Sequence, residues 1–257
     1  MDKSTNLLSC PTVYGPKKSR RQGLSLGINL GDPDMKCCTW SCVYCQCGFG
    51  RKADGSGRYP SRNDIVRVLV HELNRHAKLD SVTIAGNSEP GTYPEFLELV
   101  KDVIAVRKKM SGNWIFNCLT NGSELDNERV RQACELLDEA WVKIDCATDQ
   151  LLLKVNRPLA RIGGIKGHLD RVRKLQSIRI QTLLWRDTDQ TRRLGNDTED
   201  NFVALLDAFK FLQPKQIHLT TIQREPATKG LEPLCLAELN KFADRVRLSG
   251  LEIAVYE

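Results

Sequence analysis

The sequence predicts an α/β protein whose parallel strands form an incomplete, open β/α barrel of about six βα units. Apolar runs of strand length alternate with helix-period segments from about residue 24 to the C-terminus, which is typical of repeated βα units. The chain has 257 residues, within the range of one α/β barrel domain, and no repeat or long linker marks a second domain. We therefore expect an N-terminal extension over residues 1–23 and an open barrel, rather than a flat doubly wound sheet, over residues 24–257.

Seven apolar segments have strand length, and parallel neighbours among them need right-handed crossover connections. The polar, glycine-containing stretch Arg186–Asp197 is expected to be a mobile loop above the sheet. The predicted strands are Leu24–Leu30, Ser81–Gly86, Trp114–Thr120, Ala140–Asp145, Ile178–Leu184, Gln216–Ile222 and Leu251–Tyr256.

Six amphipathic segments between these strands carry apolar residues at helical spacing. Asn63 and Thr198 are expected to cap the first and fifth helices, and Pro94 suits the first turn of the second. The predicted helices are Asp64–His76, Pro94–Val106, Asn127–Leu137, His168–Leu175, Glu199–Leu212 and Leu236–Leu248.

The chain carries a formal net charge of +6, and part of the excess lies in the basic run from Lys17 to Arg21. Such a run permits an anionic partner such as RNA, although a solvated basic face is an equally good interpretation.

No run of about 18 apolar residues appears, and the first residues lack the pattern of a secretion signal. We expect a soluble, cytoplasmic protein with no membrane segment.

Five of the ten cysteines fall between Cys37 and Cys47, and this clustering in a chain of cytosolic type indicates metal binding rather than disulfides. Cys38, Cys42 and Cys45 follow the first predicted strand at spacings of four and three residues. Soft thiolates suit iron, and three close cysteines around a four-iron cluster leave one iron without a local protein ligand. The alternative is a zinc site completed by Cys37 or Cys47.

The CxxxCxxC loop, with Tyr44 directly before its last cysteine, resembles the signature of the radical S-adenosylmethionine superfamily. This resemblance implies a [4Fe-4S] cluster on Cys38, Cys42 and Cys45, whose free iron chelates S-adenosylmethionine. The reduced cluster would then yield methionine and the 5′-deoxyadenosyl radical, with an electron supplied by a donor such as flavodoxin or ferredoxin. The segment Tyr14–Leu30 is similar to the subgroup of the tRNA wyosine-synthesis radical enzymes and their uncharacterised bacterial relatives.

After the second predicted strand, Gly86, Asn87 and Glu89 stand where the superfamily carries a Gly-Gly-Glu-type motif that contacts the S-adenosylmethionine amino group. Glycine permits close backbone approach, and the Glu89 carboxylate can accept a hydrogen bond from an ammonium group. A simple βα turn would explain Gly86 and Pro90 but not a charged residue at position 89.

Further cofactor-binding candidates lie at the carboxyl ends of later strands, where barrel active sites are built. By resemblance, Asn121 and Lys143 are candidate partners of the ribose or the methionine carboxylate, although Lys143 and Asp145 could simply pair with each other. The full set of such candidates is Asn121, Lys143, Asp145, Gln181 and Ile222.

The other cysteines and the four histidines have simpler explanations. Core packing is favoured for Cys118 and Cys146, with hydrogen-atom transfer or a second cluster as the alternative. Cys10, Cys134 and Cys235 are expected to be ordinary core or surface residues, and no histidine has ligand spacing.

Three function hypotheses remain open. They are a radical enzyme acting on RNA, a radical enzyme modifying a peptide or small metabolite, and a non-enzymatic zinc or iron–sulfur sensor. The wyosine-synthesis enzymes carry further cysteines upstream of the radical loop, whereas only Cys10 and Cys37 lie there in this chain. The specific reaction of that branch therefore does not follow from the resemblance.

Overall fold

The structure is a computed structural model that describes residues 11–50, 59–76, 78–160 and 162–257. One curved sheet has the strand order β1-β2-β3-β4-β5-β6-β7-β9, and β8 pairs with β6 off this path. The pairs from β2 to β9 on this path are parallel, whereas β1 is antiparallel to β2. The strands are β1 (Val13–Ser19), β2 (Gly23–Ile28), β3 (Ser81–Ile84), β4 (Ile115–Thr120), β5 (Glu139–Lys143), β6 (Arg179–Asp187), β7 (Gln216–Thr221), β8 (Leu231–Pro233) and β9 (Ile253–Tyr256).

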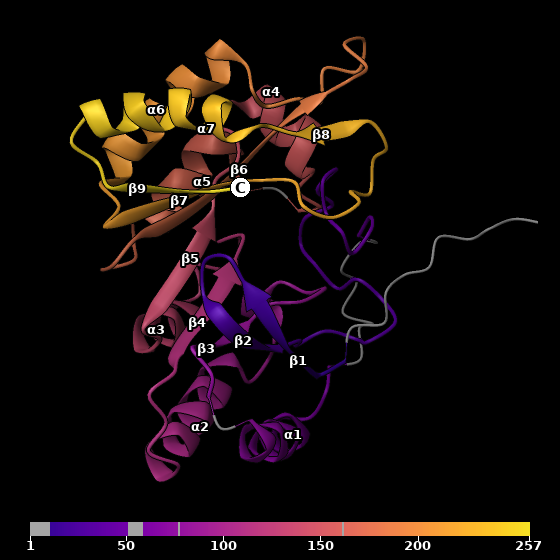
Figure 1. The fold of residues 1–257 in the computed structure, drawn as a ribbon, viewed down its shortest axis with the longest axis vertical. Helices are drawn as coiled ribbons and strands as arrows, with labels where there is room; N and C mark the ends of the chain where they lie inside the picture. The colour runs from indigo at the N-terminus through magenta and orange to yellow at the C-terminus, as the bar shows by residue number, and fades with distance from the viewer. Residues whose placement is uncertain (1–10, 51–58, 77, 161) are drawn as a thin grey trace, which may run out of the picture.

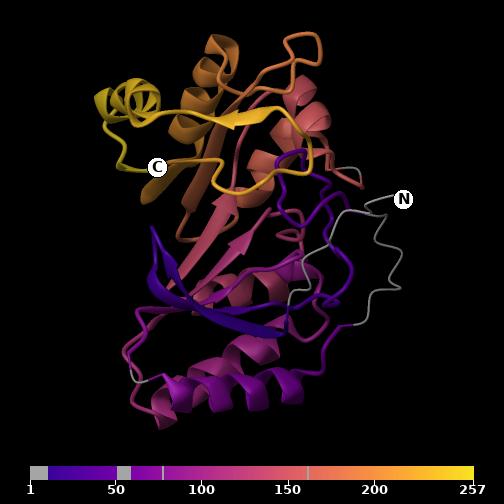
Figure 2. The ribbon, with the colours of Figure 1, turned by 45° about the vertical axis from the view of Figure 1, so that its right-hand side comes forward.

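The predicted open β/α barrel is confirmed. Parallel strands follow one another in chain order, and the edge strands β1 and β9 do not pair with each other within the described residues. Helices lie on the outer face, with α1 to α3 beside the first strands and α5 to α7 beside the last (Figures 1 and 2). The helices are α1 (Arg62–Arg75), α2 (Phe96–Lys109), α3 (Glu128–Leu136), α4 (Asp149–Leu151), α5 (Gly164–Val172), α6 (Glu199–Leu212), α7 (Leu236–Leu248), the 3₁₀ turn η1 (Pro90–Thr92) and the π-helix η2 (Leu152–Asn156).

Alternation along the strands separates the core under the helices from the interior of the barrel. On β2, Leu26 and Ile28 belong to the large apolar core, whereas Ser25 and Gly27 line a cavity on the other face. Thr83, the register partner of Gly27 on β3, lines the same cavity. The carboxyl ends of the parallel strands meet at one edge of this cavity, and that edge positions the site described below.

The segment before the barrel holds a strand that the sequence analysis did not predict. Residues Val13–Ser19 form β1, which extends the sheet beyond β2 as an antiparallel edge strand. This strand lacks an apolar pattern in the sequence, because exposed polar residues such as Lys17 and Lys18 occupy it. Cys10 lies outside the described residues.

Several predicted boundaries were wrong for local reasons. The first helix is capped by Ser61, whose side chain accepts a hydrogen bond from the backbone N–H of Asp64, and not by Asn63. The second begins at Phe96, so Pro94 lies outside its first turn. The Thr198 cap is confirmed, because its side chain accepts from the Asn201 backbone. None of the described helices is long and apolar enough to cross a membrane.

The stretch predicted as a mobile loop above the sheet is anchored at both its ends. Arg186 and Asp187 complete β6, where they pair with β8. Farther along, Asn196 is completely buried, and its Nδ2 donates to the backbone oxygens of Asp145 and Leu183 at 2.8 Å. Hydrogen bonds from a buried side chain to the backbone fix a loop despite its polar composition.

His168 on α5 gives the fold a pH-dependent element. It is 1% exposed and packs on Trp40 with ring centroids 5.1 Å apart. Burial disfavours the charged imidazolium and lowers the pKa of His168 to about 4. Below the ordinary histidine pKa, the unfolded chain therefore binds a proton that the folded chain does not bind until about pH 4.

His168→Phe is expected to weaken the pH dependence of stability. In the natural chain His168 should lower the free energy of unfolding by about 3 kcal/mol as the pH falls from about 6.5 to 4. The variant should lose correspondingly less stability over this interval in urea unfolding measured at several pH values. His71→Phe, on an exposed face of α1, is the control. An unchanged pH profile in His168→Phe would contradict the assignment.

Candidate functional site

The predicted cluster loop follows β2 and is fastened from two sides. The Cys37 backbone N–H donates to the Asn87 carbonyl at 2.9 Å, beyond the end of β3. The Val43 backbone N–H donates to the Val155 carbonyl at 2.9 Å, in the π-helix η2. π-helical turns are rare and are frequent at functional sites. The loop that carries the three cysteines is therefore held between the first and second halves of the barrel.

The three predicted ligands Cys38, Cys42 and Cys45 gather around a buried lysine. Lys36 is 6% exposed, and its Nζ donates to the Gly48 carbonyl at 2.8 Å. Burial opposes its charge, but the negative charge that Cys45, Cys38 and Cys42 carry when ionised outweighs this effect and raises the pKa of the Lys36 ammonium. A buried cation on the loop that carries three cysteines fits an anionic iron–sulfur cluster on their sulfurs.

Amide groups also reach two of these thiols. Asn121 Nδ2 lies 3.6 Å from Cys38 Sγ, and Asn156 Nδ2 lies 3.6 Å from Cys42 Sγ. Such donors around the ligands are the outer contacts that orient ligands and tune a metal site.

The thiols themselves differ in their acidity. Burial raises the pKa of Cys38 to about 12 and that of Cys42 to about 11. A hydrogen bond from Cys47, together with the Lys36 ammonium, lowers the pKa of Cys45 to about 5. Since iron binds the thiolate form, coordination would offset the burial that keeps the first two thiols protonated.

A single-ion site is a poorer fit to this geometry. Zinc needs four ligands that converge on one point. Within the described parts of the chain, no three His, Cys, Asp or Glu side chains are placed to hold one metal ion. A cuboidal cluster binds each thiolate at a different corner, so its three sulfur ligands need not converge on one point.

The Gly86–Glu89 segment contacts the start of the cluster loop. A Cβ atom on Gly86 would lie 2.1 Å from Asn29 Oδ1, so only glycine fits against this side chain. Asn87 Nδ2 donates to the Asp32 carbonyl at 2.6 Å, and Ser88 forms a bridge with Cys37. The close approach that was expected toward a cofactor is made here to the protein itself.

Glu89 is buried, with 2% of its surface exposed, and its carboxylate is occupied by protein donors. It accepts from the Thr120 hydroxyl, from the Asn121 backbone N–H at 2.8 Å and from the Gly91 backbone N–H at 3.3 Å. Burial raises the pKa of Glu89 to about 7, although these hydrogen bonds oppose the shift. The carboxylate thus ties the end of β3 to the end of β4.

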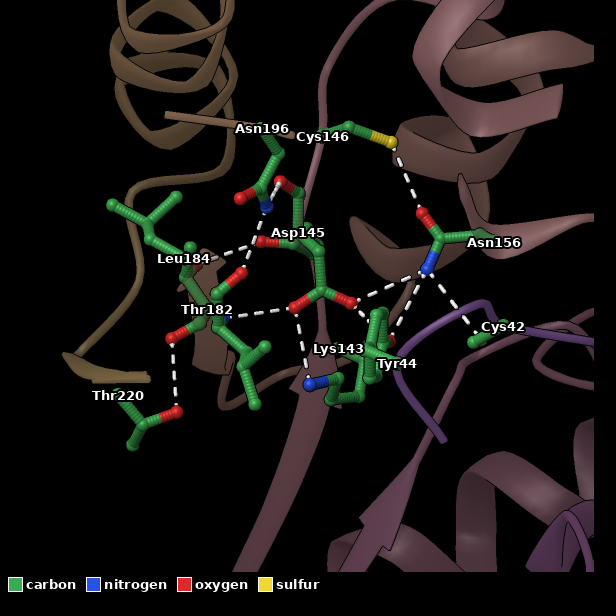
Figure 3. Close-up of polar contacts among 12 residues, drawn as sticks. Cys42, Tyr44, Lys143, Asp145, Cys146, Asn156, Thr182, Leu184, Asn196 and Thr220 are labelled. Carbon is green, nitrogen blue, oxygen red and sulfur yellow. Dashed lines mark hydrogen bonds and ion pairs between the residues drawn. The ribbon is translucent and has the colours of Figure 1, made fainter. Parts of the chain in front are cut away.

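Asp145, just beyond the end of β5, is the centre of the network drawn in Figure 3. Its side chain is fully buried and pairs with Lys143 Nζ at 3.1 Å. It also accepts from the Tyr44 hydroxyl, from Asn156 Nδ2 at 3.2 Å and from the Leu183 backbone N–H at 2.9 Å. The predicted pair of Lys143 and Asp145 therefore exists, and it holds the tyrosine of the cysteine loop.

The cavity on the concave face of the sheet has a volume of about 500 Å³. Of the predicted cofactor-binding residues, Tyr44, Gly86, Gln181 and Ile222 line it. Gln181 is 6% exposed, and its Oε1 has no hydrogen-bond partner within the described residues. The remaining candidates are not among the residues that line the cavity. They are Asn87, Glu89, Asn121, Lys143 and Asp145.

The cavity wall is strongly cationic. No aspartate or glutamate is among the residues that line it. Within the described residues, the cations of the β1–β2 hairpin form no ion pair with a carboxylate, and a nitrogen of Arg21 is buried without a hydrogen-bond partner. The cationic residues of the wall are Lys17, Lys18, Arg20, Arg21 and Arg224.

Sequence reasoning missed Lys36 and the roles of Asn156 and Asn196. Lys36 stands two residues before Cys38, but nothing in a sequence pattern distinguishes a buried lysine from an exposed one. Cys118, Cys134 and Cys146 are buried, and Cys146 Sγ donates to Asn156 Oδ1 at 3.0 Å. Cys235 is exposed.

Comparisons of sequence agree with this geometry. The profile of the radical SAM superfamily matches residues 33–186. The chain is 31% identical over 231 residues to a UPF0026 protein of Synechocystis sp., covering 86% of this chain and 80% of that protein. It is 28% identical over 241 residues to a UPF0026 protein of Methanocaldococcus jannaschii, covering 90% and 69%.

Solved structures share the fold. A radical SAM methyltransferase from Sphaerobacter thermophilus superposes with a TM-score of 0.67 at 16% identity, covering 90% of this chain and 65% of that one. Archaeal TYW1 superposes with a TM-score of 0.54 at 15% identity, covering 87% and 71%. Streptococcus suis SuiB bound to S-adenosylmethionine gives 0.61 at 13%, and this chain spans about half of its length. With the cysteine loop inside the matched residues and an open barrel around it, the chain belongs to the radical SAM superfamily.

Proposed function

We propose that the chain cleaves S-adenosylmethionine reductively, with Cys38, Cys42 and Cys45 holding a [4Fe-4S] cluster. The observation that carries this proposal is that the loop with these three cysteines, closed by the buried Lys36, borders the cavity through Tyr44 and Cys45. When bound, the cluster and S-adenosylmethionine supply one-electron chemistry that yields methionine and a 5′-deoxyadenosyl radical. The chain's own residues bind, orient and shield the reactants.

In this proposal the cofactor-binding residues act in two ways. Tyr44, Gly86, Gln181 and Ile222 contact S-adenosylmethionine from the cavity wall. The unpartnered Gln181 Oε1 accepts a hydrogen bond from it, because a buried acceptor without a partner is costly. The other predicted residues keep the side chains that contact S-adenosylmethionine in place. They are Asn87, Glu89, Asn121, Lys143 and Asp145.

The test is anaerobic reconstitution with iron and sulfide, followed by reduction with dithionite in the presence of S-adenosylmethionine. Chromatography should detect 5′-deoxyadenosine, which a sample without enzyme should not form. In the cell, the proposal places the protein in the cytoplasm, where thiols stay reduced and flavodoxin or ferredoxin supplies the electron. A chain that binds zinc and no iron after reconstitution would overturn the proposal.

For the substrate, we propose RNA. The cations of the cavity wall face no carboxylate there, and S-adenosylmethionine is itself positively charged at its sulfonium and ammonium groups. Phosphates along RNA supply negative charge that complements this wall. Lys17, Lys18 and Arg20 are exposed, so a chain larger than the cavity can reach them.

Replacing Lys17, Lys18, Arg20 and Arg21 together with glutamine is expected to weaken RNA binding and its salt dependence. Loss of four phosphate contacts should reduce the slope of log K against log salt by about 3 for single-stranded RNA. Electrophoretic shift or fluorescence anisotropy at several salt concentrations measures this slope. The control replaces Lys101, Lys108, Lys109 and Lys241, which are exposed on α2 and α7. An equal loss of RNA binding in both variants would mean that RNA is attracted by overall charge and not by this wall, which would contradict the proposed substrate.

A further inference from the structure

Lys36 is unusual among the lysines of the chain. It is the only lysine that is buried among the described residues, with 6% of its surface exposed. Within those residues it forms no ion pair with a carboxylate, whereas Lys143 has Asp145 at 3.1 Å. Burying a charge is costly unless an opposite charge accompanies it. The sequence around Lys36 must therefore supply negative charge from another source.

The cysteine thiols are that source. The Lys36 ammonium closes the loop that holds Cys38, Cys42 and Cys45, and these three cysteines favour its charged form. Three thiolates bound to iron stay anionic at any pH at which the cluster is intact. The fixed charge of Lys36 is thus balanced only when the ligands are in their metal-binding form.

Lys36 also closes the loop that carries these ligands. Its Nζ donates to the Gly48 carbonyl at 2.8 Å, which joins the residues immediately before and after the cysteine segment. Inside this ring, the Gly48 backbone N–H donates to the Cys45 carbonyl at 3.1 Å, and the Cys45 N–H donates to the Cys42 carbonyl at 3.2 Å. The ammonium is consequently held inside the cysteine loop, where little of the side chain is exposed to solvent.

We infer that Lys36 is a positioning residue that closes the cysteine loop and, through its buried positive charge, raises the reduction potential of the iron–sulfur cluster. This inference rests on the proposed function, because it needs the cluster on Cys38, Cys42 and Cys45. One-electron reduction by an external donor adds one negative charge to the cluster and its ligands. A buried cation beside them stabilises the reduced form more than the oxidised form, and little water is present to screen it.

The test is a redox titration of the reconstituted full chain without S-adenosylmethionine, followed by electron paramagnetic resonance of the reduced cluster. Lys36→Gln keeps an N–H donor for the Gly48 carbonyl but loses the charge, and Lys36→Arg keeps the charge. At a fixed solution potential, Lys36→Gln should lower the ratio of reduced to oxidised cluster about tenfold. This corresponds to a midpoint potential about 59 mV lower for a one-electron couple. Lys36→Arg and the exposed control Lys101→Gln should keep the natural midpoint.

Each result of the titration and of cluster loading supports or overturns the inference. A natural midpoint in Lys36→Gln overturns the charge effect, whatever its activity. If Lys36→Gln takes up no iron while Lys36→Arg loads fully, the charge is needed even to assemble the cluster, which supports the inference. If neither loads, charge alone is not what the site requires, and the inference fails. Absence of a cluster from the natural chain would instead overturn the proposed function.

Discussion

Cys42→Ala is expected to abolish both the iron–sulfur cluster and the formation of 5′-deoxyadenosine. Cys42 is buried, and its sulfur lies 3.6 Å from Asn156 Nδ2, so no other cysteine can replace it without moving the loop. With two of three ligands left, a cubane has no stable seat on this loop. Iron and sulfide analysis, the visible absorption of the reconstituted protein and chromatography of the reaction measure the loss.

The matched control is Cys235→Ala. Cys235 is exposed at the start of α7, far along the chain from the loop, and its removal should leave iron content and product formation unchanged. Full cleavage of S-adenosylmethionine by Cys42→Ala would contradict the assignment of the ligands. Loss of activity with normal iron content would mean that Cys42 acts on substrate instead of the cluster.

The barrel could be predicted because its strands and helices differ in period. The helices α6 and α7 were predicted to the residue, and the strands β7 and β9 that follow them to within two residues, since these helices begin and end where the amphipathic pattern does. The edge strand β1 could not be predicted in this way. Its exposed lysines carry no apolar alternation, and its pairing with β2 is decided by tertiary structure.

The cysteine ligands could be read from spacing, but their surroundings could not. The π-helix η2 supports the loop through hydrogen bonds between residues far apart in the chain, such as that from Val43 to Val155, which are 112 positions apart. Lys36 became a candidate only when its burial was known. Local patterns identify which residues carry chemistry, whereas burial and long-range contacts decide what holds them.

Glu89 illustrates the same limit. Its position after β3 was predictable, and a carboxylate there suggested direct contact with an ammonium group. In the structure the carboxylate accepts hydrogen bonds from Thr120 and the Asn121 backbone N–H at the end of β4 and from the Gly91 backbone N–H. The sequence cannot distinguish a carboxylate that faces a ligand from one that joins two strands, because both occur at strand ends.

Asp145→Ala is expected to destabilise the folded chain strongly. The buried carboxylate balances Lys143, whose side chain is 16% exposed, and it accepts from Tyr44 and the Leu183 backbone. Removing one partner of a buried ion pair leaves an uncompensated charge and typically costs about 3–5 kcal/mol. Urea unfolding of the iron-free protein measures the change, and Asp145→Asn, which keeps an acceptor for Leu183, should cost less.

A double variant separates the charge from the network. If the cost of Asp145→Ala comes from leaving the Lys143 ammonium unpaired, adding Lys143→Met should recover part of the lost free energy of unfolding, since groups 3.1 Å apart are coupled. If the two costs simply add, the carboxylate contributes through Tyr44 and Asn156 instead. In that case the loop should also hold iron less well in Asp145→Ala, because the Tyr44 ring next to Cys45 would lose the hydrogen bond that orients it.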